Sequence, residues 1–272
     1  MPTKQGKSPS EYYKNDLAID QAGNTVVDAV TRKVQDGAGN NTAISLSDDE
    51  FFVKPVNDDS VRTFCTKTSG GSIVLSVDTT NSKVLVGASQ VAANTQYAYF
   101  GIDWEDSSGL TADTHHAIPF QAATGSVATG GSVMGSATSS SFNDTDPATS
   151  LTFSTSGHYY AMCYWYVIDN ITIDAVHWLH GADLVTGEDT AAHLMAYTVD
   201  TGNGSTGGDL SSGVVVADGD TITNAGREQI YYQSMTVQSA NVDAGKVILF
   251  TFASDTINSD YSINATVKYH IR

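Results

Sequence analysis

Histidine side chains are the first candidates for chemistry in this sequence, because metal sites and general bases often depend on them. His177 and His180 flank Trp178, and His193 follows thirteen residues after His180. Three such histidines could form a zinc or iron site of the jelly-roll metalloenzyme type. The spacing of His177 and His180, however, places them on opposite faces of a strand. We therefore expect histidines that are hydrogen-bonded or face solvent, with a metalloenzyme as the alternative.

A second pair of histidines and two cysteines are weaker candidates. His115 and His116 are adjacent near Asp113, in a segment that we expect to be a polar loop. Neighbouring strand residues point to opposite faces, so these two rings could share one ion only across a turn. Cys65 and Cys163 lie about a hundred residues apart, which predicts two mostly buried thiols rather than a disulfide framework or a cysteine zinc site.

Acidic and amide side chains gather in one loop at Asp200, Asn203 and Asp209, and again at Asp218 and Asp220. Several oxygen ligands in a loop could hold calcium, but the regular Asp-x-Asp-x-Asp-Gly spacing is absent. Asp and Asn also stabilise ordinary turns through their side chains, which explains the pattern without an ion. We therefore predict no cofactor, with weak calcium binding as the alternative.

Nucleophile and nucleotide-binding motifs are missing from the sequence. It has no Gly-x-Ser-x-Gly elbow followed by a helix. The glycine-rich segment 202–208 lacks the lysine and the following helix that a phosphate-binding loop requires. Paired catalytic carboxylates of a glycosidase need only be neighbours in space, so spacing does not reveal them. The residue patterns indicate a protein that is not an enzyme.

Aromatic side chains are concentrated in the C-terminal third of the chain. Alternate residues of a strand face the same way, so these side chains could line a subunit interface or a platform for sugars. The alternative role for them is the core of a sandwich. The residues that we assign to a ligand or subunit interface are Tyr160, Tyr164, Tyr166, Trp178 and Tyr231.

Composition and charge restrict the function classes. The chain has 272 residues, of which 16% are charged, and a net charge of −17, whereas a typical domain has ~25% charged residues. An acidic surface repels phosphate backbones, so we expect no nucleic-acid partner. No apolar stretch is long enough for a membrane helix, so we expect no membrane association. Segment 1–16 also lacks the apolar core of a signal peptide.

Short strands separated by turns are the elements that we expect before residue 90. Segment 43–47 alternates apolar and polar residues, as a half-buried strand does. Segments 72–78 and 83–87, joined by the turn 79–82, predict a β-hairpin. A possible strand follows at 97–104, and no helix of ordinary length is expected past residue 30.

Stronger strand patterns follow residue 148. The apolar runs 159–168 and 246–253 predict strands that are covered on both faces. Segment 261–271 predicts a long alternating strand. The sequence therefore predicts an all-β protein whose C-terminal antiparallel β-sandwich is jelly-roll-like, with a Greek-key barrel as the alternative.

Four segments make up the expected domain organisation. We predict an N-terminal docking arm at 1–30, an attachment or shaft domain rich in β-hairpins at 31–120, a linker rich in Gly, Ser, Ala and Thr at 121–147, and the sandwich at 148–272. The arm could hold a short helix at 10–17 and cannot bury a core alone. We assign docking on a larger particle to Tyr12, Tyr13 and Leu17.

Two stretches resemble virion proteins of bacteriophages. Segment 72–87, SIVLSVDTTNSKVLVG, is similar to a unit of strand, Val-Asp, turn and Val-x-Val-Gly in tail-fibre and other virion proteins of marine and cyanobacterial phages. Segment 36–49, DGAGNNTAISLSDD, resembles the stretch that often precedes that unit. The resemblance implies an intertwined, usually trimeric, β-structured appendage, such as a head fibre or decoration protein or a short tail fibre.

A physical argument also favours a trimer. Short isolated hairpins are marginally stable in water, and three copies around an axis would cover their apolar faces and edges. We therefore expect a homotrimer that is attached through its N-terminal part to major capsid or tail proteins. Such a virion protein would be made in the host cytoplasm and released by lysis. The alternative is a carbohydrate-binding receptor-recognition module, whose partner would be a host surface glycan.

Overall fold

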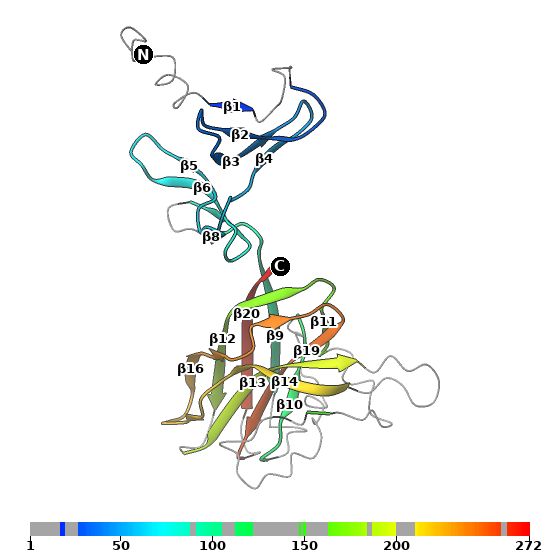
Figure 1. Cartoon of the computed structure of the whole chain (residues 1–272). Coiled ribbons are helices and arrows are strands. Elements are labelled where there is room, and N and C mark those ends of the chain that lie inside the picture. Colours follow the sequence, from blue (N-terminus) through cyan, green and yellow to red (C-terminus); the bar gives the residue numbers. More distant parts are fainter. Residues whose placement is uncertain are drawn as a thin grey trace. The chain divides into compact units, whose positions relative to one another are not determined.

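The computed structural model describes residues 17–19, 27–87, 91–104, 112–121, 147, 149–150, 163–183, 187–199, 210–256 and 260–272. Within these ranges the protein is all-β, as the sequence predicted: the elements are strands in antiparallel sheets, without helices. The chain forms two compact units, which we call the N-terminal unit (1–94) and the sandwich unit (95–272; Figure 1). The helix considered for 10–17 lies outside the described residues, apart from Leu17.

The N-terminal unit contains two four-stranded antiparallel sheets. The first has the order β1-β2-β3-β4, with strands Ala18–Ile19, Arg32–Gln35, Asn41–Leu46 and Phe51–Val53. The second has the order β5-β6-β7-β8, with strands Phe64–Lys67, Ile73–Asp78, Lys83–Val86 and Val91–Ala92. The hairpin predicted for 72–87 is confirmed, because β6 and β7 pair in antiparallel register.

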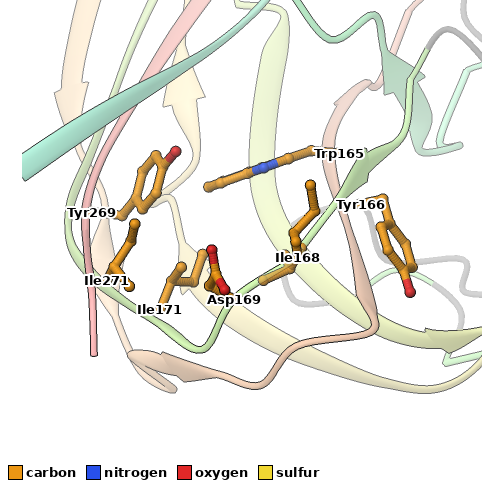
Figure 2. A pocket seen from close by; sticks show the side chains of 8 residues that line it. Trp165, Tyr166, Ile168, Asp169, Ile171, Tyr269 and Ile271 are labelled. Carbon is orange, nitrogen blue, oxygen red and sulfur yellow. The ribbon is translucent and has the colours of Figure 1, made fainter.

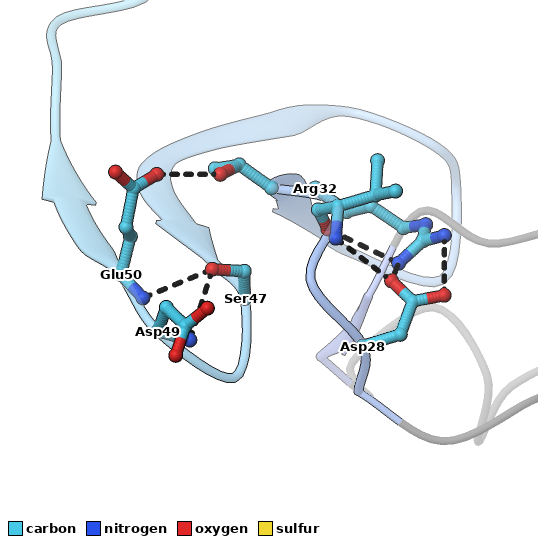
Figure 3. Close-up of polar contacts among 7 residues, drawn as sticks. Asp28, Arg32, Ser47, Asp49 and Glu50 are labelled. Atoms are coloured by element: carbon cyan, nitrogen blue, oxygen red, sulfur yellow. Dashed lines mark hydrogen bonds and ion pairs between the residues drawn. The ribbon is translucent and has the colours of Figure 1, made fainter.

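Polar contacts order the turns of the first sheet (Figure 3). The hydroxyl of Thr31 donates to Glu50 Oε2 at 3.0 Å, and Ser47 Oγ accepts from the backbone N–H of Glu50 at 2.9 Å. Arg32 pairs with Asp28 through both terminal nitrogens, with Nη2 3.0 Å from Oδ2. The hydrogen bond from Arg32 lowers the pKa of the Asp28 carboxyl. Such exposed contacts fix loop geometry but add little stability.

The sandwich unit consists of two sheets (Figure 1). The five-stranded sheet has the order β16-β12-β20-β9, and β18 also pairs with β12. Its strands are Gln229–Ser234, Ile171–Asp183, Asp260–Ile271, Thr95–Trp104 and, for β18, Asn241–Val242. The register of these strands is continuous over long stretches, so the same side of each strand faces the core.

The seven-stranded sheet has the order β10-β19-β13-β14-β17. These strands are His116–Ile118, Lys246–Ser254, Asp189–Val199, Leu210–Asp218 and Thr236–Val237. Two short strands lie off this path: β11, Trp165–Tyr166, pairs with β19, and β15, Ile222–Thr223, pairs with β13. Phe120, just after β10, forms a bridge with Phe100 in β9, so this segment connects the two sheets at one edge.

The core lies between the two sheets and is rich in aromatic side chains. Trp178 from the five-stranded sheet packs against Phe250 and Phe252 from the other sheet, with ring centroids 6.4 and 6.0 Å apart. A second apolar cluster, which includes Met195, Tyr197 and Leu249, covers the other face of the seven-stranded sheet. The prediction that 246–253 is covered on both faces is therefore confirmed, because 247–254 are all buried.

The prediction for the other apolar run, 159–168, is wrong for the residues of it that the structure describes. Residues 163–165 are buried or half-buried, but from Trp165 on buried and exposed side chains alternate, and Tyr166 and Ile168 are exposed. The physical reason is that β11 pairs with β19 over only two residues, so one of its faces has no second layer among the described residues. Residues 159–162 lie outside the described part of the chain.

The boundary of the sandwich also differs from the expected position. β9 pairs with β20 over ten residues, and β10 pairs with β19, so residues 95–118 belong to the sandwich and not to an attachment domain that ends at 120. The arm predicted for 1–30 contributes β1, which pairs with β2. The expected linker at 121–147 lies outside the described residues, apart from its two end residues. The jelly-roll strand order stays a prediction.

Candidate functional site

The second sheet of the N-terminal unit has one apolar face. Val77 in β6 lies opposite Phe64 in β5 on one side and opposite Val84 in β7 on the other. Leu75 lies opposite Val86 one step further along. Directly paired residues point to the same side of an antiparallel sheet. These side chains therefore form one continuous surface, which we call the apolar face: Phe64, Ile73, Leu75, Val77, Val84 and Val86.

This apolar face has no cover within the described part of the unit. Phe64, Val84 and Val86 are 37–38% exposed, and the other three side chains are half-buried. Val34 is the one apolar side chain in the described part of residues 1–94 that is buried. Further large apolar side chains of the unit are exposed: Leu17, Val27, Val30, Phe51, Phe52, Val56, Val61 and Val74. Removing such surface from water is worth ~25 cal/mol per Å², so a partner that covers it would stabilise the unit.

The opposite side of the same sheet carries Cys65, Val74 and Leu85 beside Ser76 and Asp78, of which Asp78 orders the hairpin. Ser76 and Asp78 are buried there. The Asp78 carboxylate accepts hydrogen bonds from the backbone N–H of Asn81 at 2.9 Å and from the Asn81 side-chain amide at 2.8 Å. These contacts fix the turn between β6 and β7. The arrangement can bind another apolar surface but brings no nucleophile or general base together.

The aromatic residues that we predicted for an interface have different environments. Trp178 is 1% exposed and belongs to the core, and its indole N–H donates to Gln233 Oε1 at 3.0 Å. Tyr231 is half-buried, and its hydroxyl donates to Asn224 Oδ1. Trp178 is therefore a core residue and not an interface residue, because the alternation of β12 turns it inward.

Two of the remaining predicted aromatics are described. Tyr164 is half-buried against the second apolar cluster, whereas Tyr166 is 57% exposed. Tyr160 lies outside the described residues, as do Tyr12 and Tyr13 of the expected docking segment. Leu17 of that segment is 67% exposed. The sequence patterns gave no role to Tyr97, Tyr99 or Tyr232. The alternation of side chains in β9 nevertheless predicts that Tyr97 and Tyr99 face outward.

A small pocket lies beside Tyr166 at the end of the sandwich where β20 ends. Its volume is about 160 Å³, well below the ~300–1,000 Å³ of usual ligand pockets. Figure 2 shows Trp165, Ile168, Ile271 and Asp169 around it. The ring of Phe120 stacks on Trp165, with parallel planes and ring centroids 5.9 Å apart. The pocket has room for one side chain of a partner at most.

The three histidines of the metalloenzyme alternative do not meet. His177 lies on the outer side of β12, where its Nδ1 is 2.8 Å from the Tyr232 hydroxyl. His180 is buried on the inner side and stacks on Trp178 at 4.9 Å. His193 lies on the far side of the other sheet, with its Nε2 3.0 Å from Asp218. The predicted opposite facing of His177 and His180 is confirmed, and the residues present do not fit one shared metal site.

Burial governs the ionisation of two of these candidate groups. It lowers the pKa of His180 to about 4, so this ring is neutral near pH 7. It raises the pKa of the Cys163 thiol to about 12, which makes that side chain unreactive. Cys163 and Cys65 are not joined in a disulfide.

The structure also shows the burial and contacts of the second pair of histidines and of two candidate calcium ligands. His115 and His116 are buried rather than part of an exposed polar loop, and the His115 ring lies 5.0 Å from that of His193. Asp218 pairs with His193, and the backbone carbonyl of Asp220 accepts from Gln233. Residues 200–209 lie outside the described part. Among the described residues, no group of three His, Cys, Asp or Glu side chains is arranged to hold a metal ion.

Comparison with known proteins gives no relatives for this chain: no protein-family model and no curated protein sequence matches it. In the described residues, no helix has the length and apolar character needed to cross a membrane.

Proposed function

We propose that this chain is a non-enzymatic structural protein of a bacteriophage particle, a trimeric surface appendage. Its N-terminal unit would attach it to capsid or tail proteins, and its sandwich unit would project as a head decoration, a head fibre or a short tail fibre. The apolar face of the N-terminal unit is the observation that carries this proposal.

The apolar face supports self-association because Val34 is the one apolar side chain that is buried in the described part of the unit. Small sheets need a second layer or another partner for independent stability. A three-fold arrangement would place three copies of the face around one axis and bury each against its neighbours. The similarity of segments 36–49 and 72–87 to phage virion proteins supports the same assembly, since the apolar face is built largely from the second of these segments.

The low charge density and acidic surface fit a protein displayed in many copies. A net charge of −17 keeps neighbouring appendages from associating non-specifically.

Light scattering of the full-length protein tests the assembly. We expect a trimer with three times the 28.7 kDa mass of one chain. The variant Val84→Asp, which places a charge in the apolar face, should shift the protein to the monomer. Val214→Asp is the matched control, because Val214 is also exposed but lies in the sandwich unit. A wild-type monomer, or an equal effect of both variants, would overturn the proposed assembly.

Electron microscopy of particles tests the location. Gold-labelled antibodies raised against the sandwich unit should decorate the surface of intact phage particles from the source of this sequence. Labelling that appears only in lysate debris, with none on particles, would overturn the assignment to a virion.

A further inference from the structure

The outer side of the five-stranded sheet carries a second surface with a distinct pattern. Register places three rows of side chains across it. The first row contains Ser234, His177, Thr266 and Tyr99, the second contains Tyr232, Leu179 and Asn264, and the third contains Ile230, Gly181, Ser262 and Asp103. Tyr97 lies beside Tyr99 on β9, opposite Lys268. We call this surface the outer face.

Aromatic and apolar side chains lie at the two sides of the outer face. Tyr97 and Tyr99 are 52% and 48% exposed along β9, and Tyr232 and Ile230 are 63% and 78% exposed along β16. Strands in a sheet are ~4.8 Å apart, so the two sides are separated by roughly 15 Å. This distance is wide enough for several linked sugar rings to lie across the sheet.

The β20 part of the centre of the outer face is polar, whereas β12 beside it contributes Leu179, which is 44% exposed. β20 contributes Ser262, Asn264, Thr266 and Lys268, and Ser262 and Asn264 are exposed. Their hydroxyl and amide groups both donate and accept hydrogen bonds, and the Lys268 ammonium donates them. Protein interfaces usually have an apolar centre and a polar rim, whereas a polar strand runs through the centre here beside Leu179. The outer face therefore suits a ligand that is rich in hydroxyl groups better than a second copy of the chain.

One aromatic residue is held in place before any ligand arrives. The Tyr232 hydroxyl is 2.8 Å from His177 Nδ1, and the two rings stack with centroids 5.7 Å apart and planes 15° apart. This contact limits the rotamers of Tyr232 in the free protein. A ring that is already ordered loses less conformational entropy when a ligand stacks on it.

We propose that the outer face binds a neutral polysaccharide. The C–H faces of the sugar rings would stack on Tyr97, Tyr99 and Tyr232, and the hydroxyl groups would hydrogen-bond to the side chains of β20. Asp103 and Lys268 contribute one charge of each sign, so the face does not select a charged ligand. The net charge of −17 further disfavours an acidic polymer. This inference goes beyond the proposed assembly and does not depend on it.

Affinity electrophoresis of the full-length protein tests the inference. Native gels would contain hydroxyethylcellulose, galactomannan or soluble starch as neutral probes, and alginate as the acidic comparison. We expect at least one neutral polymer to retard the protein and alginate not to. Tyr99→Ala should weaken binding about tenfold, as the loss of one stacking contact implies. Tyr99→Phe should retain most of it, and Asn264→Ala should weaken it by a smaller factor.

Tyr166→Ala is the matched control, because Tyr166 is similarly exposed but belongs to β11. Urea unfolding of each variant, followed by fluorescence, checks that the sandwich unit stays folded. Absence of retardation by all three neutral polymers would overturn the inference, as would equal effects of the Tyr99 and Tyr166 variants. A loss of oligomer mass in Tyr97→Ala/Tyr99→Ala would assign the outer face to a subunit contact and would overturn it too. The oligomer mass of the wild-type protein tests the proposed trimer separately from polysaccharide binding.

Discussion

The two units of this protein use the same kinds of strands and turns but bury apolar side chains to very different degrees. In the sandwich unit, two sheets face each other and enclose a core that includes Phe100, Trp178, Phe250 and Phe252. In the described part of the N-terminal unit, Val34 alone among apolar side chains is buried. The difference indicates that strand patterning is enough to form a sheet, whereas stability requires a second apolar layer. The sandwich supplies that layer itself, whereas the described part of the N-terminal unit does not.

The largest expected effect comes from removing a core ring of the sandwich. Phe250 is fully buried and lies 5.9 Å from the ring of Phe100. Phe250→Ala should lower the free energy of unfolding by about 3–5 kcal/mol, because it loses burial and leaves a cavity. The measurement is urea unfolding followed by tryptophan fluorescence. Trp104, Trp165 and Trp178 all belong to the sandwich unit, so this signal reports on that unit.

Phe51→Ala is the corresponding change in the N-terminal unit, where Phe51 is 61% exposed. It should change the free energy of this fluorescence transition by no more than about 0.5 kcal/mol. Equal effects of the two variants would contradict the view that the sandwich unit is stabilised by its own core.

Acidification should weaken the sandwich through His180. Burial holds the pKa of this ring at about 4, below the ordinary value of 6.5. The unfolded chain therefore binds a proton below pH 6.5 that the folded chain takes up only near pH 4. Stability is complete above pH 6.5 and falls as the pH drops toward 4, by up to roughly 3 kcal/mol.

Unfolding of the wild type and of His180→Phe at pH 7, 6 and 5 checks this expectation. The variant keeps an aromatic ring beside Trp178 but has no group to protonate, so its stability should fall less steeply over this range. Parallel pH profiles would show that His180 is not the origin of the acid sensitivity.

Substitutions at two glycines distinguish the cost of a steric clash in the core from the cost of a strained backbone conformation. A Cβ at Gly213 would lie 2.5 Å from the buried ring of Tyr197 and 3.0 Å from the backbone of Thr149. Gly213→Ala should therefore lower sandwich stability by about 1–3 kcal/mol. Gly39 has open space around it and a φ of +83°, so Gly39→Ala should cost about 1 kcal/mol through backbone strain alone.

The first glycine variant is measured by the fluorescence transition and the second by hydrogen exchange in β2 and β3. Gly39→Ala should leave the fluorescence transition unchanged. A shift of that transition by Gly39→Ala would mean that the two units unfold together, which would weaken the comparison between them.

A local effect is expected in the hairpin of the N-terminal unit. Asp78→Ala removes the acceptors for Asn81 that order the turn between β6 and β7. It should cost about 1 kcal/mol, the typical net value of such hydrogen bonds. Faster amide exchange in β6 and β7, with exchange in β19 unchanged, is the expected result. Unchanged exchange in β6 and β7 would mean that partner chains and not the turn hold the hairpin.

Much of the secondary structure could be predicted from the sequence because strand patterns are local. Alternation at 261–271 and the apolar run at 246–253 correspond to β20 and β19, and the hairpin of β6 and β7 follows from its turn residues. The alternation of side chains along a strand also predicts that His177 and His180 lie on opposite faces. The all-β class follows from these patterns, since segments of this kind recur along the whole chain.

The assignment of strands to sheets could not be predicted in the same way. Segment 97–104 has a recognisable strand pattern, but nothing nearby in the sequence reveals its pairing with β20, some 160 residues later. The burial of Trp178 could not be predicted from local sequence either, because it depends on which sheet packs against β12. The rows of the outer face likewise join β16, β12, β20 and β9, which are distant in sequence.

The sequence by itself determined which segments form strands, where they turn and which side chains alternate, because these depend on neighbouring residues. Only the tertiary structure decided which alternating faces meet. It placed one face of β12 against β19 and left the other carrying His177 and Leu179 outward. It also left Val84 and Val86 without a covering layer among the described residues. The reason is that burial is a property of pairs of surfaces, and the partner of a surface can come from anywhere in the chain or from another chain.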